Sequence, residues 1–342
     1  MWLIPLRDLQ WRRRRFAIAV VATGLVFALA LLLSGVSTSF DNEIRRTVAS
    51  FHGDSWLVAR GGFGPFTGPT PFAAALAADV RRSAGVVRAD AVAIVRATTT
   101  TPSVRNVNVI GVTAGGVGAP GQRLGGRAAV VDASLGLDRG DRLDLNGTSF
   151  HVAGVTHGLT YFAGIPNVIV ELREAQRLGF GGEPLATAIV VQGEPGSVPP
   201  QLAQLSNHDA RVDLGRPVHQ AKQTISLIRW LLWAVAAGII GAMVYLSALE
   251  RLRDFAVLKA IGVSTRSLLA GLLLQAVLLA LAAALLAVAL EFAMAPAAAM
   301  SVEVSATGFL MLPLVAVAVG VLASLLALRR AVAVDPALAF GG

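Results

Sequence analysis

The side chains that most often perform catalysis or bind metals form no recognisable constellation in this chain. The five histidines are His52, His151, His157, His208 and His219. His151 and His157 lie six residues apart and could share one strand face, but neither an HExxH motif nor a group of carboxylates accompanies them. No GxSxG motif occurs, and the absence of cysteine excludes disulfides, thiol catalysis and thiolate metal sites. We therefore expect neither a catalytic site nor a metal site.

A glycine-rich loop with two phenylalanines runs from Gly61 to Pro69. It lacks the lysine of a phosphate-binding P-loop, and Pro65 removes one backbone N–H, so the pattern does not support a nucleotide site. The simpler interpretation is a purely structural loop. The alternative is that Phe63 and Phe66 are exposed aromatic residues that contact an apolar substrate or a partner protein.

A short segment, residues 250–265, combines charge with apolar residues at helical spacing. It predicts an amphipathic helix with an apolar stripe on one side, ended by Gly262, with Ser264 as the N-cap of the next helix. A solvated loop at a membrane edge needs no such stripe, whereas a groove on a cytoplasmic partner would explain it. The residues that we expect to make this contact are Glu250, Arg251, Arg253, Phe255, Leu258, Lys259, Ile261 and Gly262.

Four long stretches without a charged residue are the elements that must position these segments. They are Phe16–Thr38, Trp230–Leu249, Ser267–Leu290 and Val304–Leu328. As a helix of roughly 30–38 Å, each could cross a hydrocarbon core of about 30 Å. Hydrophobic residues make up 55% of the chain and the mean hydropathy is +0.66, which is too apolar for an ordinary soluble domain. The sequence therefore predicts a membrane protein with four transmembrane α-helices, at residues 16–38, 226–249, 266–290 and 304–328.

The distribution of charge predicts how these helices are oriented. The net charge of +8 is concentrated at membrane edges, in Arg12–Arg15, in residues 250–266 and in Arg329–Arg330, which argues against a nucleic-acid partner. The loop over residues 291–303 has no Lys or Arg and two glutamates. The positive-inside rule then places the amphipathic segment 1–15, the segment 250–265 and the tail 329–342 in the cytoplasm. We expect a multi-pass protein of the plasma (inner) membrane with both termini cytoplasmic, and a first span that is an uncleaved anchor.

Residues 39–225, between the first and second spans, are predicted to form a large mixed α/β extracytoplasmic domain. The expected strands are Ser55–Arg60, Ala91–Thr99, Asn106–Val112, Ala128–Asp132, Arg142–Leu145, Ser149–Val155, Asn167–Val170 and Thr187–Gln192. Asn146-Gly147 indicates a hairpin turn, since both residues tolerate a positive φ. Helices are expected at Pro71–Ala84 and Leu172–Leu178. Apolar residues at helical spacing also continue both spans into this domain, as ordinary packing or as a paired stalk.

Small residues recur at intervals of four in the predicted spans, which permits close approach of helices within or between subunits. They are Gly24 and Ala28; Ala234, Gly238 and Ala242; and Ala316, Gly320 and Ser324. The four uncharged stretches contain no ionisable side chain, and Gln275 is their most polar long residue. A buried charge is costly and is kept only for a task, so this pattern argues against a proton-coupled carrier or an ion channel.

The segment ERLRDFAVLKAIGVSTRSLLAGLLLQA, residues 250–276, resembles the signature of FtsX/MacB-type ABC transporter permeases. The N-terminal LRDLQWRRRRFAIAV is similar to the family's N-terminal segment, and Arg329-Arg330 followed by Asp335-Pro336 is similar to its ending. Residues 126–156 and 166–178 resemble the MacB-type periplasmic core domain. The chain lacks a fused nucleotide-binding domain and its outer domain is shorter than in the MacB pump, so it is most similar to stand-alone DevC-type permeases.

The resemblance implies a non-catalytic permease subunit that works with a separate cytoplasmic ABC ATPase dimer. That ATPase would bind ATP and Mg²⁺, and this chain would need no cofactor. A second copy of the permease, as a homodimer, and membrane lipid are the other implied partners, with room for an extracytoplasmic protein. ATP binding would move the segment 250–262, and the stalks would relay this motion outward for export or extraction of an apolar or amphiphilic substrate. One alternative is a transmembrane regulator that activates a cell-wall hydrolase. A further alternative is a permease that imports a solute such as an amino acid.

Overall fold

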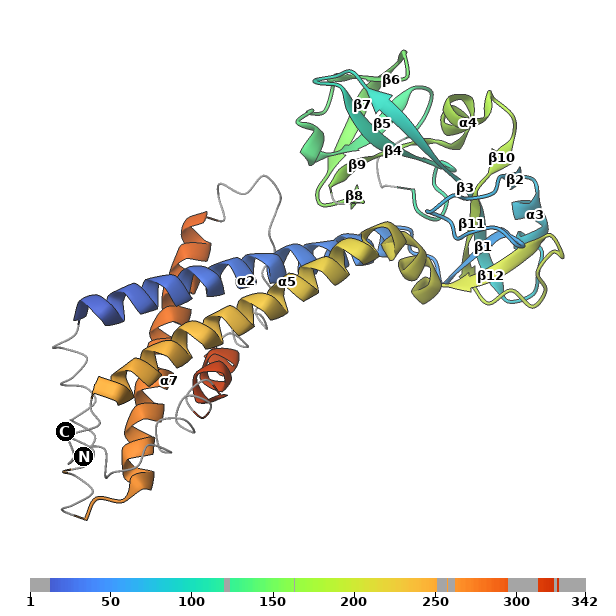
Figure 1. Ribbon diagram of the computed structural model, residues 1–342. Coiled ribbons are helices and arrows are strands. Elements are labelled where there is room, and N and C mark those ends of the chain that lie inside the picture. Colours follow the sequence, from blue (N-terminus) through green and yellow to red (C-terminus); the bar gives the residue numbers. More distant parts are fainter. Residues whose placement is uncertain are drawn as a thin grey trace. The chain divides into compact units, whose positions relative to one another are not determined.

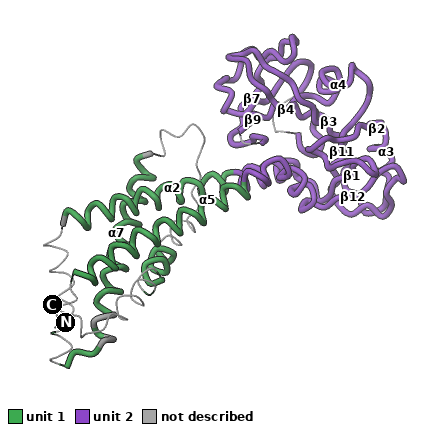
Figure 2. Tube along the Cα trace, in the orientation of Figure 1, with its two compact units in different colours: residues 1–39, 222–342 green, residues 40–221 purple. Residues whose placement is uncertain are grey.

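The computed structural model describes residues 13–119, 124–162, 164–250, 257, 262–294, 313–322 and 325. The chain divides into two compact units (Figure 2). Residues 1–39 and 222–342 form one, here called the membrane unit, and residues 40–221 form the other, here called the sheet unit. The division falls inside two long helices, α2 (Arg13–Ala49) and α5 (Asn207–Glu250), each of which contributes residues to both units.

Three helices in the described part of the chain are long and apolar enough to cross a membrane: α2, α5 and α7 (Thr265–Met294) (Figure 1). They confirm the first three predicted spans as apolar helices. A shorter apolar helix covers Pro313–Leu322, while most of the predicted span 304–328 lies outside the described residues. Helix α7 continues to Met294, beyond the end of the predicted span, and Glu291 is a helical residue that is 5% exposed.

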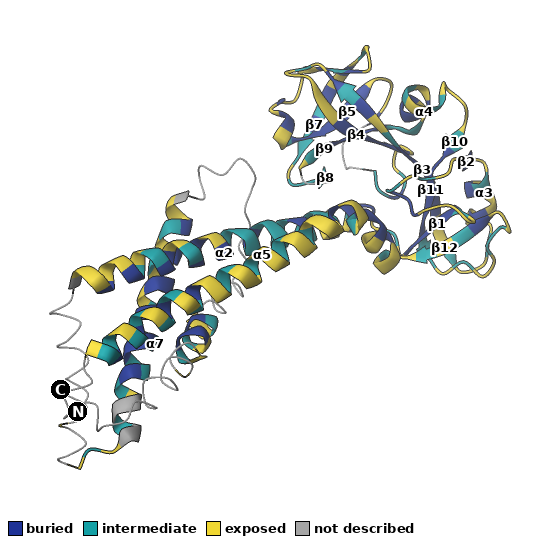
Figure 3. Ribbon diagram, in the orientation of Figure 1, coloured by how far each residue is buried: buried dark blue, intermediate teal, exposed yellow. Residues whose placement is uncertain are grey.

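The membrane unit is held together by a core of small and branched apolar side chains. Phe27, Leu31, Ile240 and Leu279 are buried there together with many alanines of α5 and α7. Both α2 and α5 also carry exposed residues (Figure 3). Several of these are apolar, among them Ile18, Leu25 and Leu231, as expected for helix surfaces that face lipid. A tilted contact between the rings of Phe27 and Trp233, with centroids 5.4 Å apart, joins α2 to α5 within this core.

The sheet unit is built on a ten-stranded mixed sheet with the order β12-β1-β11-β3-β4-β9-β5-β7-β6, and β8 pairs with β9. A second, two-stranded sheet is formed by β2 and β10. The strands are β1 (Ser55–Ala59), β2 (Phe72–Ala73), β3 (Val86–Thr99), β4 (Arg105–Val112), β5 (Ala128–Asp132), β6 (Arg142–Leu145), β7 (Thr148–Thr156), β8 (Thr160–Tyr161), β9 (Ile165–Glu171), β10 (Leu185–Ala186), β11 (Ala188–Gly193) and β12 (Leu202–Ser206). The eight predicted strands correspond to β1, β3, β4, β5, β6, β7, β9 and β11.

The long strand β3 belongs to two halves of this sheet. Its first half pairs with β11, and its second half pairs with β4. The second half curls until β6 returns to β3 at Thr99↔Leu145, which encloses an apolar core that includes Val109, Val131 and Phe150. The other face of this curled sheet carries Ile94, which belongs to a separate core.

The predicted helix over Pro71–Ala84 is wrong in extent. Only Leu76–Arg81 forms a helix, α3, while Phe72–Ala73 forms strand β2 and pairs with β10. Ala74 N donates to Pro184 O at 2.9 Å, so pairing with a distant segment outweighs the helical propensity of the alanine run. The second predicted helix is present as α4 (Leu172–Phe180), and the Asn146-Gly147 turn has φ of 49° and 80°, as expected for a type I′ hairpin.

Helix α5 begins at Asn207, and its start is tied to the sheet. Ser206 and Asp209 form a capping box, in which Asp209 N donates to Ser206 Oγ at 3.2 Å and Ser206 N donates to Asp209 Oδ2 at 2.9 Å. The next residue, Asn207, accepts from Trp56 Nε1 at 2.8 Å and donates to Gly53 O at 2.8 Å. The predicted helical continuation of both spans is confirmed, since α2 ends at Ala49 and α5 starts at Asn207.

Candidate functional site

A buried carboxylate of α5 holds the glycine-rich loop. Asp213 is 2% exposed, and its oxygens accept hydrogen bonds from Phe66 N at 2.9 Å and Thr67 N at 3.1 Å, and from the Thr67 hydroxyl. Arg216, one turn along α5, lies 3.7 Å from the same carboxylate. Two backbone N–H groups and one hydroxyl of the loop converge on Asp213, and these contacts, here called the Asp213 clamp, hold the loop against α5.

Glycine at position 64 is required by this clamp. A Cβ atom at Gly64 would lie 2.2 Å from Asp213 Cγ and 2.6 Å from Asp213 Cβ, well inside any tolerated contact. The loop can approach the helix this closely only because residue 64 has no side chain. The glycine-rich composition therefore serves backbone packing, which supports the simpler of the two interpretations drawn from the sequence.

The expectation that both loop phenylalanines are exposed is wrong for Phe66. Its side chain is 3% exposed and lies in the core, with ring centroids 5.3 Å from Trp56 and 6.0 Å from Tyr161. The Asp213 clamp turns the loop inward at this residue, so Phe66 is buried by packing. Phe63 is 61% exposed and lies against the Arg216 guanidinium, 5.8 Å from its ring centroid. Its role as a contact for a partner or substrate stays a prediction.

Tyr161 of β8 connects the loop held by Asp213 to the sheet. Its hydroxyl donates to Phe66 O, and its side chain is buried in the same core. Burial raises the pKa of Tyr161 well above its usual value, and the Asp213 carboxylate raises it further while Arg96 lowers it. The phenol therefore stays protonated at neutral pH and remains a hydrogen-bond donor.

A surface groove opens beside Tyr161, on the face of the sheet where β3 and β4 pair. Its volume is about 330 Å³. Its polar lining consists of Arg96, Thr98, Asn106, Asn108 and Asn146. Its apolar lining includes Tyr161, Phe162 and Ile165. Arg96 pairs with Asn108 and Thr98 with Asn106 across the strands, so these four side chains share one face.

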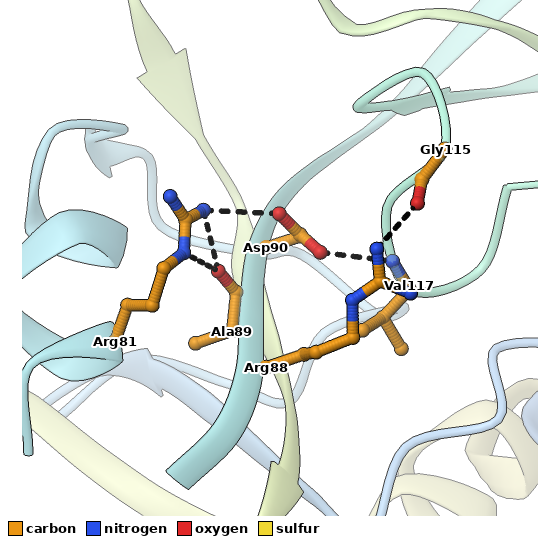
Figure 4. Close-up of polar contacts among 6 residues, drawn as sticks. All are labelled: Arg81, Arg88, Ala89, Asp90, Gly115 and Val117. Atoms are coloured by element: carbon orange, nitrogen blue, oxygen red, sulfur yellow. Dashed lines mark hydrogen bonds and ion pairs between the residues drawn. The ribbon is translucent and has the colours of Figure 1, made fainter.

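A second buried carboxylate, Asp90, also has a structural role (Figure 4). It accepts from Arg81 Nη2 at 3.0 Å and from Val117 N at 2.9 Å, and Arg88 donates to Gly115 O at 2.7 Å. Figure 4 shows Asp90 between the arginine of α3 and the loop that follows β4. Its oxygens are occupied by these donors, so Asp90 holds the loop against β3 and is a poor candidate for acid–base chemistry.

In the membrane unit, the small residues lie where helices approach. A Cβ at Gly24 would lie 2.8 Å from Leu286 Cδ2 and 3.3 Å from Ala283 O, so α2 contacts α7 at this glycine. Gly320 similarly approaches Ala276 O, at 3.2 Å from a built Cβ. Ala28 is buried in the same core. Close helix approach at Gly24 and Gly320 is therefore observed within the chain.

The predicted small-residue stripe of α5 has a different environment. Ala234, Gly238 and Ala242 are all exposed, and no atom lies within 4 Å of a Cβ built at Gly238. The described residues of this chain therefore do not cover that stripe. A contact with a second subunit at these positions stays a prediction.

Polar contacts also join the helices of the membrane unit. Gln275 Nε2 donates to Ser247 Oγ at 3.1 Å, which connects α7 to α5 and gives the most polar residue of the spans a partner. Arg15 at the start of α2 forms an ion pair with Glu250 at the end of α5. Glu250, which the sequence assigns to the segment 250–265, is thereby also part of the packing between these two helices.

Replacing Gly24 with valine is expected to destabilise the membrane unit, because the new side chain would overlap Leu286 and the backbone of α7. Overpacking of this kind costs about 1–3 kcal/mol. The measurement is the melting temperature of the detergent-solubilised chain. Ala17→Val is the matched control, since Ala17 is exposed on the same helix. Equal melting temperatures for the two variants would contradict the close approach of α2 and α7 at Gly24.

The predicted ATPase-contact segment is described only in part. Arg251, Arg253, Phe255, Leu258, Lys259 and Ile261 lie outside the described residues. Gly262 has φ of 93°, which fits the expected helix end, and Ser267 N donates to Ser264 Oγ at 3.3 Å at the start of α7, which confirms Ser264 as its N-cap.

Comparison with known proteins places this arrangement in a family. An ABC transporter permease of Mycobacterium tuberculosis strain H37Rv is 44% identical over 349 residues, covering 100% of both chains. The chain belongs to the FtsX-like ABC transporter permeases. A second permease of the same strain is 40% identical over 351 residues, again with 100% coverage of both chains. The family described as FtsX-like permease C-terminal matches residues 226–336 of this permease, which include α7 and the segment 250–265.

Two solved structures are similar to the permease at lower levels. The extracellular domain of the noncanonic ABC-type transporter YknZ from Gram-positive bacteria has a TM-score of 0.32 and 14% identity, covering 42% of the permease and 85% of that chain. The periplasmic region of MacB from Actinobacillus actinomycetemcomitans has a TM-score of 0.36 and 11% identity, covering 54% of the permease and 97% of that chain. The assignment to the family rests on the relatives in sequence.

Proposed function

We propose that the permease couples ATP hydrolysis by a separate cytoplasmic ATPase to conformational change in the sheet unit. In this proposal the sheet unit lies outside the cell membrane and serves export or extraction of an apolar or amphiphilic substrate. The observation that carries it is the continuity of α2 and α5. Each runs without a break from an apolar span to residues buried in the core of the sheet unit, with Val48 near the end of α2 and Leu214 in α5.

The contacts that α2 and α5 make inside the sheet unit are suited to transmit a displacement. Thr47 of α2 donates to Thr160 O at 2.9 Å, and Glu43 of α2 accepts from Gly164 N at 3.0 Å. Helix α5 is held by the clamp at Asp213 and by the hydrogen bonds of Asn207. A helix anchored by buried polar groups moves together with the sheet that satisfies them, because separating them would leave those groups without partners.

Membership of an ABC permease family implies an ATPase partner, and we propose that two copies of the permease assemble with two ATPase chains. The exposed stripe of Ala234, Gly238 and Ala242 supports a second copy as the partner that covers it, since small residues let helix backbones approach closely in lipid. Surrounding lipid contacts the remaining exposed apolar faces of the helices.

The purified permease alone is expected to hydrolyse no ATP, because its sequence contains no Walker A motif. The experiment reconstitutes the full chain in lipid nanodiscs, with and without the ATPase that co-purifies with it, and measures phosphate release and the mass of the complex. Hydrolysis should require the ATPase, and the mass should match two copies of each chain. Robust hydrolysis by the permease alone would overturn the proposal.

Labelling of introduced cysteines tests the proposed orientation, and the natural chain provides a background without cysteine. Val104 is 76% exposed in the turn between β3 and β4, so Val104→Cys is expected to react with an impermeant maleimide in intact cells. Arg253→Cys should react only after the cells are permeabilised, because the positive-inside rule places it in the cytoplasm. The reverse pattern of labelling would contradict this orientation.

A further inference from the structure

The groove beside Tyr161 is dominated by hydrogen-bond donors. Thr98 N donates to Asn146 Oδ1 at 2.9 Å, and because a backbone N–H can only donate, this bond fixes the orientation of the Asn146 amide. The Nδ2 group of Asn146 is left as the donor for a ligand. The Thr98 hydroxyl lies 3.5 Å from Asn106 Oδ1, and Asn108 Nδ2 donates to Asn167 Oδ1 at 3.0 Å. The amide oxygens of Asn146 and Asn106 are therefore engaged within the protein, as is the Nδ2 group of Asn108.

The lining of the groove is also positively charged. It contains one cation, Arg96, and no carboxylate. Among the residues that the structure describes, no Asp or Glu forms an ion pair with Arg96. The guanidinium instead lies over the Phe162 ring, 5.8 Å from its centroid, so its planar donors are positioned by an aromatic face. A positioned guanidinium beside amide N–H groups matches the oxygens of a carboxylate or a phosphate.

Apolar side chains border the donors on one side. Phe162 contacts Tyr161 in a tilted arrangement with ring centroids 4.0 Å apart, and Ile165 lies next to them in the lining. Phe162 adopts φ of 45°, a conformation that is uncommon for a bulky residue and that often marks functional positions. The groove volume of about 330 Å³ is in the range of sites for small ligands.

We propose that this groove binds an organic oxyanion, a carboxylate or a phosphate ester that carries an apolar group. The oxygens contact Arg96 and the amide of Asn146, and the apolar group contacts Phe162 and Ile165. Both a soluble metabolite and the headgroup region of an anionic lipid offer this chemistry. As a statement about what the permease moves, the inference rests on the proposed function, whereas binding itself requires neither ATPase nor nucleotide.

The test is calorimetric titration of the full chain in phosphatidylcholine nanodiscs, with empty nanodiscs subtracted. The probes are 1-naphthyl phosphate, its neutral counterpart 1-naphthol, lysophosphatidylglycerol and the zwitterionic lysophosphatidylcholine. We expect saturable binding of at least one anionic probe, and binding of its uncharged or zwitterionic counterpart at least about 10-fold weaker, because a charge-assisted hydrogen bond is lost. Saturable binding of 1-naphthyl phosphate would identify the ligand as a soluble oxyanion. Saturable binding of lysophosphatidylglycerol alone would identify it as a lipid headgroup.

Two substitutions separate this site from general attraction of anions. Arg96→Gln removes the charge, and Asn146→Asp keeps the oxygen that accepts from Thr98 N but replaces the donor with a carboxylate. Each should weaken binding of the anionic probe at least about 10-fold with an unchanged melting temperature. Arg142→Gln is the matched control, since Arg142 is exposed on β6 and outside the lining. The proposal is overturned if neither anionic probe saturates, if 1-naphthol binds as well as its phosphate, or if Arg96→Gln behaves like Arg142→Gln. ATPase stimulation is not measured here, so a negative result leaves the proposed function standing.

Discussion

Asp213→Ala is expected to lower the free energy of unfolding of the sheet unit by about 3 kcal/mol or more. The substitution removes the acceptor for Phe66 N and Thr67 N, which lie at 2.9 and 3.1 Å from the carboxylate, and for the Thr67 hydroxyl. Each buried donor left without a partner costs about 1–3 kcal/mol. In a unit of this size the loss corresponds to a fall of roughly 6–12 °C in melting temperature. Thermal unfolding of the purified full chain, followed by protease resistance of residues 40–221, measures it.

Asp79→Ala is the control for this prediction, since Asp79 is an exposed residue paired only with exposed Arg82, and exposed pairs contribute little. Gly64→Ala should reproduce much of the loss, because its Cβ would overlap Asp213. The two changes should combine to less than the sum of their separate effects, since removal of the carboxylate also removes the overlap. Additive effects, or a melting temperature for Asp213→Ala equal to that of Asp79→Ala, would show that the loop is not held by this helix.

Phe255→Ala and Leu258→Asp are expected to separate ATP hydrolysis from function. Both residues belong to the apolar stripe of the segment 250–265, at a position where the family resemblance implies contact with the ATPase. Truncating one buried anchor at a protein interface commonly costs about 1–3 kcal/mol, which weakens binding roughly 5- to 150-fold. The measurements are the affinity of the ATPase for the permease in nanodiscs and the stimulation of hydrolysis in the reconstituted complex.

Arg251→Ala is the control in the same segment and should have a smaller effect, because an exposed charge contributes little to an interface. Membrane insertion and melting temperature should be preserved in all three variants, since residues 251, 255 and 258 come after the end of α5 at Glu250 and before the start of α7 at Thr265. Normal affinity and full stimulation in both apolar variants would show that the segment does not receive the motion of the ATPase.

Local patterns predicted most of the elements of this permease. Short runs of apolar and β-branched residues gave the strands around Val109, Val131 and Val190, whose side chains are buried in the cores of the sheet unit. The Asn146-Gly147 turn was predictable because few residue pairs adopt two consecutive positive φ values. The spans were predictable because a membrane tolerates little besides uncharged helices of sufficient length.

The failures share a physical cause, which is contact between distant parts of the chain. Phe72 becomes a strand because β10, more than a hundred residues later, pairs with it. Phe66 is buried because Asp213 binds the loop around it. Asp213 did give one signal in the sequence: it is a carboxylate next to the buried face formed by Ala210 and Leu214, where an unpaired charge would be costly. The groove gave none, because its lining comes from four separate segments.

The position of β1 in the sheet has a consequence for the time course of synthesis. Its two neighbours are β11, through Ser55↔Val191, and β12, through Ser55↔Ser206, so both partners are made more than 130 residues after it. At about 5–20 residues per second, Trp56 and Leu57 wait roughly 7–30 s before either edge of their strand can be paired. During that interval an apolar strand with two open edges is a target for aggregation. We therefore expect β1 to need protection by chaperones for longer than strands that pair with a neighbour in the sequence. Mutations that slow the docking of β11 and β12 should first reduce the yield of the permease rather than its activity.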